Sequence, residues 1–117
     1  MKKQQLEEIK KRLEIDHEEI KVRMVELKKS DPFSDPDYSN DNAAVDNDVR
    51  EQEAHQRIEA ELDTLKEKKV NIEQALKRIE KGNYGFCKRC NKEIPEKRLE
   101  LVPETSYCVD CESVIKR

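Results

Sequence analysis

The sequence predicts a mostly α-helical protein, with a long antiparallel coiled-coil hairpin, then a small four-cysteine module and a short C-terminal helix. Three observations lead to this fold class. Apolar residues recur every seven positions in two long, highly charged stretches. An acidic segment with turn-forming residues separates these stretches. Four cysteines in two close pairs follow the second stretch. We therefore expect a hairpin domain over 1–81 and a cysteine domain over 82–117.

The composition favours elongated helices over a large globular core. Charged residues make up 44% of the 117 residues, hydrophobic residues 34% and aromatic residues 4%. Such a chain is either largely disordered or built from helices that need only a narrow apolar seam, and the heptads favour the helices. The net charge of -3 argues against general nucleic-acid binding. No stretch is long and apolar enough for a signal peptide or a membrane span, so we expect a cytoplasmic protein without a membrane contact.

The first helix is expected over residues 1–29. Ile9 occupies the alternate heptad position, Met24 flanks the seam, and the positions between are almost all Lys, Arg or Glu. The sequence Ser-Asp-Pro at 30–32 should stop the helix, because proline cannot continue it. The main seam positions, each seven residues apart, are Leu6, Leu13, Ile20 and Leu27.

Residues 31–48 read as an acidic loop at the tip of the hairpin. Six of these residues are Asp, two are Pro and none is Lys or Arg. The second helix should start between Asp41 and Asp48. Either Asn42 or Asp48 could cap it, the latter with Glu51 three residues on, and both remain open. An acidic run is usually a solvated linker, but its carboxylates could also work beside a hard cation such as Mg²⁺ in another macromolecule.

The second helix is expected to run from about 46 to 81. Leu62 and Leu76 fill the alternate heptad position, and Gly82 should cap the C-terminal end. Two seams joined by one loop predict an antiparallel hairpin, although the seams could also drive self-association into a longer coiled coil. The main seam positions are Ile58, Leu65, Ile72 and Ile79.

The cysteine spacing predicts a structural zinc site. The pattern is C-x2-C, seventeen residues, then C-x2-C, which lets two tight turns supply a tetrahedral set of thiolates. Disulfides are disfavoured in a reducing compartment, and a redox C-x-x-C motif needs a βαβ context that is missing. Four thiolates close the coordination shell, whereas catalytic zinc keeps a position open. The candidate ligands of this zinc finger are Cys87, Cys90, Cys108 and Cys111.

The chain shows no set of residues typical of an enzyme active site, so we do not expect an enzyme. His17 and His55 fall in the predicted helices, far from the cysteines in sequence, and we expect them on the surface or in the seam. The segment between the cysteine pairs should form one short loop or hairpin, and residues 109–117 a short helix. Nearby basic residues should offset the negative charge of the thiolates rather than bind phosphate; they are Lys88, Arg89, Lys92, Lys97 and Arg98.

The zinc segment resembles the DksA/TraR family of bacterial RNA polymerase regulators. Residues 84–86, Tyr-Gly-Phe, fit the aromatic-Gly-aromatic approach to the first cysteine of that family. Lys88 departs from the Asp, Glu or Ser that the family usually has there. The cysteine pairs of the family frame an isoleucine, an arginine and a proline, and all stand in register here as Cys87, Cys90, Ile94, Arg98, Pro103, Cys108 and Cys111.

The resemblance implies a partner and a mechanism. Members of the family insert their hairpin into the secondary channel of RNA polymerase, bring its tip near the catalytic Mg²⁺, and destabilise initiation complexes without contacting DNA, often together with guanosine tetraphosphate. The tip of well-known members carries D-x-x-D-x-A. The nearest match here supplies Asp41 and Ala43, while Tyr38 stands at the first Asp position with Asp37 beside it.

Two other functions compete with polymerase binding. A DNA-binding zinc protein would use the basic residues around the cysteines as a phosphate patch, although the acidic balance of the chain counts against it. A coiled-coil adaptor with a zinc clip would have no role in transcription. Retention of RNA polymerase by the protein would separate the regulator from the adaptor.

Overall fold

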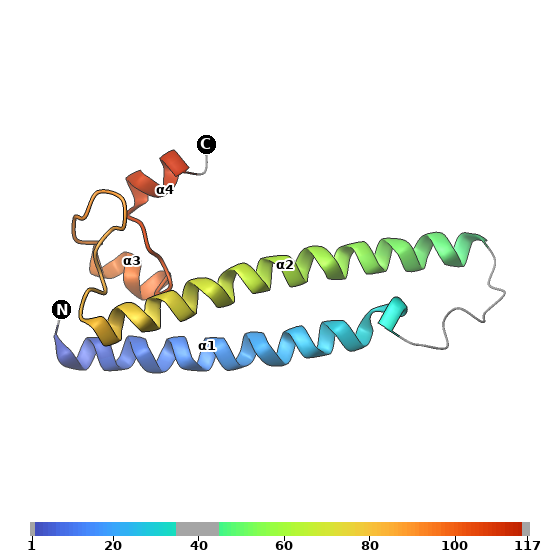
Figure 1. Cartoon of the computed structure of the whole chain (residues 1–117), viewed down its shortest axis with the longest axis horizontal. Coiled ribbons are helices and arrows are strands. Elements are labelled where there is room, and N and C mark those ends of the chain that lie inside the picture. The colour runs from blue at the N-terminus through green and yellow to red at the C-terminus, as the bar shows by residue number, and fades with distance from the viewer. Residues whose placement is uncertain (1, 35–44, 116–117) are drawn as a thin grey trace. The chain divides into compact units, whose positions relative to one another are not determined.

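The computed structural model describes residues 2–34 and 45–115, which are mostly helical, as the sequence predicts. In chain order they form α1 (Lys3–Ser30), a 3-10 turn (Pro32–Ser34), α2 (Val45–Lys81), α3 (Glu96–Leu101) and α4 (Val109–Ile115), labelled in Figure 1. The chain divides into two compact units. We call residues 1–18 with 68–117 the cysteine unit, and residues 19–67 the coil unit. Helices α1 and α2 each contribute to both.

The first helix ends where the Ser-Asp-Pro sequence predicts. α1 stops at Ser30, and the Oδ1 atom of Asp31 accepts a hydrogen bond from the backbone N–H of Phe33 at 3.0 Å. This contact makes an Asx turn, in which a side chain replaces a backbone acceptor. Pro32 then starts the 3-10 turn, so the helix cannot continue.

The start of the second helix corrects one sequence prediction. α2 begins at Val45, inside the predicted window, so residues 45–48 are helical rather than part of the acidic loop. Asp48 therefore lies within the helix and cannot be its N-cap, while Asn42 falls outside the described residues. The expected helix start at about 46 agrees with Val45 to within one residue, so only the end of the predicted acidic loop changes.

Gly82 caps α2 as predicted. Its φ of 78° is left-handed, a conformation that glycine adopts without steric cost. The N–H of Asn83 donates to the carbonyl of Arg78 at 3.0 Å, and the N–H of Gly82 donates to that of Ile79 at 3.2 Å. These two bonds make a Schellman motif, which satisfies the last carbonyls of the helix and turns the chain toward the first cysteine.

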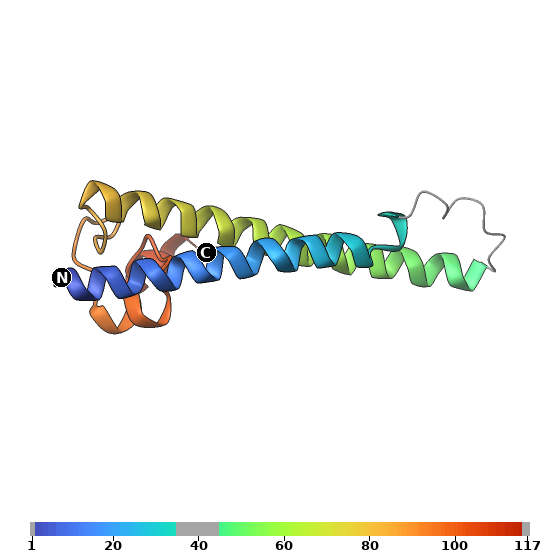
Figure 2. The same cartoon turned by 90° about the horizontal axis from the view of Figure 1, so that it is seen from below.

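In the coil unit the two helices are antiparallel. Arg23 pairs with Glu61 at 3.2 Å, and farther along α1 Asp31 meets His55 at 2.6 Å, so the partner number falls as the α1 number rises. Figures 1 and 2 both show the helices side by side along this stretch. The apolar seam is thin, and its buried members are Ile20, Leu27 and Leu62, exposed by 7%, 5% and 8%.

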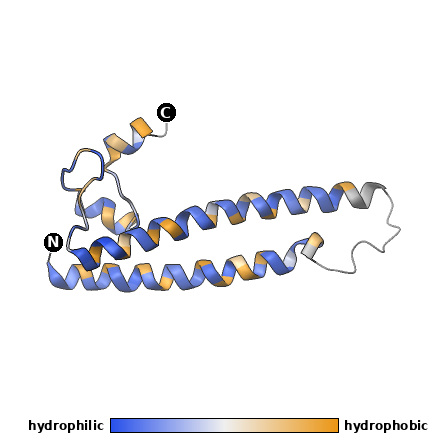
Figure 3. Ribbon diagram, viewed as in Figure 1, coloured by the Kyte–Doolittle hydropathy of each residue, from blue (hydrophilic) through white to orange (hydrophobic). Residues whose placement is uncertain are grey.

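In the cysteine unit, α1 contacts both α2 and α3. Leu13, Ile72 and Ala75 are completely buried. His17 of α1 contacts Glu73 of α2 at 3.2 Å, and the guanidinium of Arg12 donates to the carbonyl of Glu100 in α3. In Figure 3, short apolar bands recur along the otherwise hydrophilic ribbons of the long helices. No helix in the described ranges is both long and apolar enough to span a membrane.

Candidate metal centre

The structure brings the four predicted cysteines together. Their Sγ atoms all lie within 4.8 Å of one another, and none is in a disulfide. A Zn–S distance of about 2.3 Å in a regular tetrahedron separates neighbouring sulfurs by about 3.8 Å. The Sγ atoms of Cys90 and Cys108 are 3.8 Å apart. The donor set therefore fits one structural zinc ion, held by thiolates alone.

The first cysteine pair sits in a tight backbone turn. The N–H of Cys87 donates to the carbonyl of Lys92 at 2.8 Å, and the N–H of Asn91 donates back to the carbonyl of Cys87 at 2.9 Å. Asn91 has a φ of 63°, and asparagine tolerates this left-handed conformation better than most residues. The turn aims both sulfurs to one side, and an isolated bridge between Phe86 and Glu93 closes it.

The second cysteine pair marks the start of α4. Cys108 directly precedes the helix and Cys111 lies in its first turn. The N–H of Glu112 donates to the carbonyl of Cys108 at 2.9 Å, so the first helical hydrogen bond spans the pair. The N–H of Lys88 donates to the carbonyl of Ser106 at 2.8 Å and joins the two cysteine turns. The predicted terminal helix is present through Ile115, the last described residue.

The segment between the pairs contains a helix that the sequence analysis missed. We expected a short loop or hairpin, whereas Glu96–Leu101 forms α3. Its six residues are too few to show a heptad period. The available signal was Pro95 just before an acidic first residue, Glu96, which is a typical helix start.

A small core supports the zinc site. Leu99 of α3 is 1% exposed and Ile94 5% exposed, while Pro103 is fully buried. Tyr84 is also buried, and its hydroxyl donates to the carbonyl of Pro103 at 2.8 Å. Burial raises the pKa of Tyr84 to about 12, so the hydroxyl keeps its proton and can act as the donor. The backbone beside this core has a φ of 94° at Gly85, a conformation that glycine adopts without steric cost.

Arg98 and Arg78 bind the loop before the second pair. Arg98 donates through Nε to the carbonyl of Tyr107 at 3.3 Å, and its Nη2 forms an ion pair with Glu112. Arg78 of α2 donates to the carbonyl of Thr105 at 3.2 Å, and burial lowers the pKa of its guanidinium. Arg98, which the cysteine pairs of the motif frame, thus has its partners within the zinc finger.

The thiols differ in how readily they lose a proton. Burial raises the pKa of the Cys87 thiol, but hydrogen bonds from the backbone amides of Cys90, Cys108 and Arg89 outweigh it and bring the pKa down to about 6. Hydrogen bonding with the thiol of Cys108, together with burial, raises the pKa of Cys111 to about 12. The thiol of Cys87 thus loses its proton more readily than that of Cys111, and metal binding requires both as thiolates.

The remaining charged candidates do not belong to the group of four thiols. Lys88, Arg89, Lys92 and Lys97 are exposed around the zinc finger, while Arg98 is engaged internally and cannot serve a phosphate patch without breaking its ion pair. His17 and His55 are half-buried on the long helices, and neither belongs to the metal-binding group found among the described residues.

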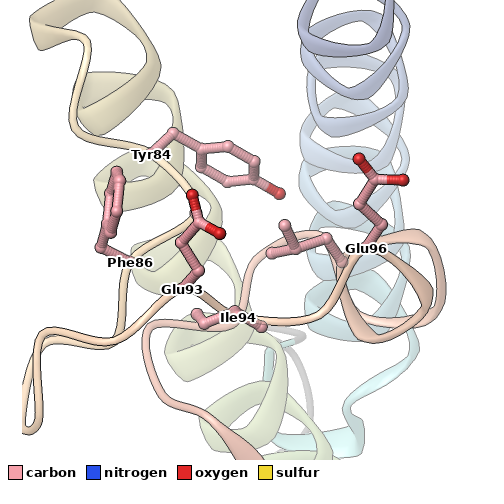
Figure 4. A pocket seen from close by; sticks show the side chains of 7 residues that line it. Tyr84, Phe86, Glu93, Ile94 and Glu96 are labelled. Carbon is pink, nitrogen blue, oxygen red and sulfur yellow. The ribbon is translucent and has the colours of Figure 1, made fainter. Parts of the chain in front are cut away.

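A small pocket lies beside the zinc finger core. Its volume is about 80 Å³, and buried Ile94 and Leu99 contribute to its lining. In the view of Figure 4, the Tyr84 ring lies between the carboxylates of Glu93 and Glu96. The volume is too small for a nucleotide or another large ligand.

The proposed tip residues Asp37, Asp41 and Ala43 fall outside the described residues.

The described part of the coil unit adds a contact that the sequence analysis missed. His55 meets Asp31 at 2.6 Å through Nδ1 and Glu59 at 2.9 Å through Nε2, and its ring lies 4.6 Å from that of Phe33. This cluster ties the turn after α1 to α2.

Comparison with known proteins assigns the zinc finger. Residues 82–117 match the family model of the prokaryotic dksA/traR C4-type zinc finger. An uncharacterized protein of Aquifex aeolicus is 49% identical over 57 residues, which are 49% of this chain and 37% of that protein. The RNA polymerase-binding transcription factor DksA of Salmonella typhimurium is 40% identical over 43 residues, 37% of this chain and 28% of that protein. The matched segments thus cover less than two fifths of these relatives.

The fold resembles that of a solved relative over almost the whole chain. The structure of transcription factor DksA2 from Pseudomonas aeruginosa superposes with a TM-score of 0.80, covering 99% of this chain and 86% of that one at 22% identity. At this identity the likeness shows a shared fold. The zinc finger at 82–117 is therefore of the prokaryotic dksA/traR C4 type.

Proposed function

We propose that the protein regulates transcription by binding RNA polymerase. In this proposal the hairpin enters the secondary channel and carries segment 35–44 toward the catalytic Mg²⁺, without contacting DNA. The observation that carries the proposal is the combination of a DksA/TraR zinc finger with a DksA2-like fold over 99% of the chain. The names of several relatives describe them as RNA polymerase-binding transcription factors.

The arrangement of the helices supports this use of the hairpin. α1 ends at Ser30 and α2 begins at Val45, so the acidic segment joins two antiparallel helices of the coil unit. A helix pair with a thin buried seam and a charged exterior suits insertion into a narrow, hydrated channel. We propose Asp37, Asp41 and Ala43 as the residues that act there, the two carboxylates through their charge and the alanine through its small size.

A binding experiment tests the partner. Immobilised protein should retain purified bacterial RNA polymerase core enzyme, and a naked DNA duplex should show no mobility shift at physiological salt. If the polymerase is not retained, the zinc-clipped adaptor becomes the better description. A salt-dependent shift of naked DNA would favour the DNA-binding alternative instead.

Run-off transcription tests the tip. Asp37→Asn with Asp41→Asn removes charge at almost constant shape, so zinc content and helicity should stay unchanged. Polymerase binding should fall only modestly, because the helices would supply most of the contact area. The effect on a sensitive promoter at saturating protein should fall much more, and Ala43→Trp should act similarly. Adding guanosine tetraphosphate to these reactions tests the co-regulator that the family resemblance implies.

The matched control is Asp63→Asn, a change of the same chemistry at an exposed position of α2. This variant should keep full activity, because an exposed substitution away from special contacts changes stability by only about 0.5 kcal/mol. Equal activity of the double tip variant, the control and the wild type would remove segment 35–44 from the mechanism.

A further inference from the structure

Arg98 contacts both flanks of the second cysteine pair. Its Nε donates to the carbonyl of Tyr107, the residue immediately before Cys108, at 3.3 Å. Its Nη2 forms an ion pair with Glu112, the residue immediately after Cys111. A single guanidinium from α3 thus spans the segment that presents two of the four sulfurs.

Arg98 is itself held firmly enough to act as an anchor. Its side chain is only 19% exposed. Its backbone N–H donates to the carbonyl of Pro95 at 3.0 Å, and its own carbonyl accepts from the N–H of Val102 at 2.7 Å. The next residue, Leu99, is buried in the zinc finger core. Because the guanidinium is planar and its donors are fixed relative to one another, the two contacts fix a geometry and not only a charge.

The Tyr107 carbonyl is a second fixed point. It also accepts a hydrogen bond from the hydroxyl of Thr105 at 2.9 Å, and Thr105 is 9% exposed. Beyond the pair, Glu112 follows Cys111 in α4, whose first helical bond runs from the N–H of Glu112 to the carbonyl of Cys108. Moving the guanidinium would therefore shift both ends of the pair together.

We propose that Arg98 is a positioning residue of the zinc site, which sets the separation and orientation of Cys108 and Cys111 by holding Tyr107 and Glu112. Partners outside the ligand set commonly orient metal ligands, and losing one typically weakens metal binding by about 10- to 100-fold. The alternative role for a cation here is to neutralise the thiolate charge. Lysine would keep that role, but its point charge cannot make the two directed contacts of the guanidinium.

The experiment measures zinc affinity and ligand geometry in the full chain. Zinc dissociation constants come from competition with a chromophoric chelator, and the absorption bands of the Co²⁺-substituted protein report the geometry of the sulfur ligands. Arg98→Gln and Arg98→Lys should both weaken zinc binding by about 10- to 100-fold and alter the Co²⁺ spectrum. Glu112→Gln should have a smaller effect of the same kind, since the contact with Tyr107 remains. Lys97→Gln, an exposed change on the same helix, should behave as wild type.

Two results would overturn the proposal. If Arg98→Lys binds zinc like the wild type and keeps its Co²⁺ spectrum, then charge alone matters. If Arg98→Gln matches Lys97→Gln in both measurements, Arg98 has no effect on the site. Should Arg98→Gln fail to fold even at saturating zinc, judged by circular dichroism, Glu112→Gln decides: an unchanged affinity and spectrum in that variant also overturn the proposal. None of these measurements depends on the proposed role in transcription.

Discussion

The coil unit and the cysteine unit are stabilised by different kinds of contact. In the coil unit, three buried residues of one stripe hold two helices together, and ion pairs such as Arg23 with Glu61 remain about half exposed. In the cysteine unit, side chains of α1 contact α2 and α3, and a buried tyrosine, backbone hydrogen bonds between distant segments and four clustered thiols hold the zinc finger together. Many weak contacts share the stabilisation of the coil unit. The cysteine unit instead depends on a few specific contacts that a different residue could not make. Substitutions of matched chemistry should therefore have very different effects in the two units.

Loss of a metal ligand should give the largest effect. Wild-type protein should contain one zinc per chain, and Cys111→Ser or Cys87→Ser should lose it, because three thiolates cannot close the tetrahedron with equal affinity. Structural zinc contributes on the order of 10 kcal/mol to the folding of such modules. Elemental analysis gives the zinc content, and amide hydrogen exchange shows which unit unfolds. Protection should vanish around residues 84–111 and persist in the coil unit. Retention of zinc by the serine variants would contradict the four-thiolate site.

An aspartate in the seam should have the next largest effect, and its size should separate the two units. Leu13 is fully buried in the cysteine unit, while Leu65 is half-buried in the coil unit. Leu13→Asp should cost several kcal/mol, because it buries an unpaired charge, and Leu65→Asp should cost less. Urea unfolding followed by circular dichroism gives both values, with Lys10→Gln as an exposed control. An unchanged helix content in Leu65→Asp would contradict the packed seam of the hairpin.

Removal of the Tyr84 hydroxyl should give an intermediate effect. Tyr84→Phe keeps the ring but leaves the buried carbonyl of Pro103 without its donor, which should cost about 1–3 kcal/mol of unfolding free energy. Thermal unfolding of zinc-loaded protein measures the loss, with exposed Glu93→Gln as the control. If both variants unfold alike, the hydrogen bond adds nothing to the stability of the cysteine unit.

The smallest effect is expected for an exposed ion pair of the coil unit. Arg23 and Glu61 have side chains exposed by 52% and 46%, so Arg23→Gln should cost no more than about 1 kcal/mol, and less at high salt. Urea unfolding at low and high ionic strength tests both statements. A loss as large as that of Tyr84→Phe would mean that the coil unit also relies on single contacts.

The sequence predicted best what periodicity and spacing encode. Heptads predicted both long helices, Gly82 and the Ser-Asp-Pro stop predicted their ends, and the cysteine spacing predicted a cluster that fits zinc. The predicted division into a hairpin domain, 1–81, and a zinc finger domain, 82–117, stays a prediction. So do the roles of the tip residues, which the structure does not describe.

The features that sequence analysis missed depend on contacts between distant residues or on elements too short to have a period. α3 has six residues, and Ala75 is fully buried although an alanine adds little to an apolar seam pattern. Arg98 bonds the backbone carbonyl of Tyr107, 9 positions away, and His55 meets Asp31, 24 positions away, and no local pattern indicates these two contacts. Once the chain is folded, these contacts explain why particular polar residues stand where they do.

The hydrogen bond between Glu112 and Cys108 has a consequence for the order in which structure forms. A helix of seven residues, as α4 is, lies far below the roughly 12–15 residues at which isolated helices become marginally stable in water, because fixing the first turn is costly. Here that first turn contains both cysteines of the second pair, so binding of the ion and nucleation of the helix fix the same backbone angles. Helicity of α4 should therefore appear and disappear with the metal. The exposed apolar side chains of Val109, Val114 and Ile115 would then form an ordered surface only in zinc-loaded protein, so the order of this surface would follow zinc occupancy.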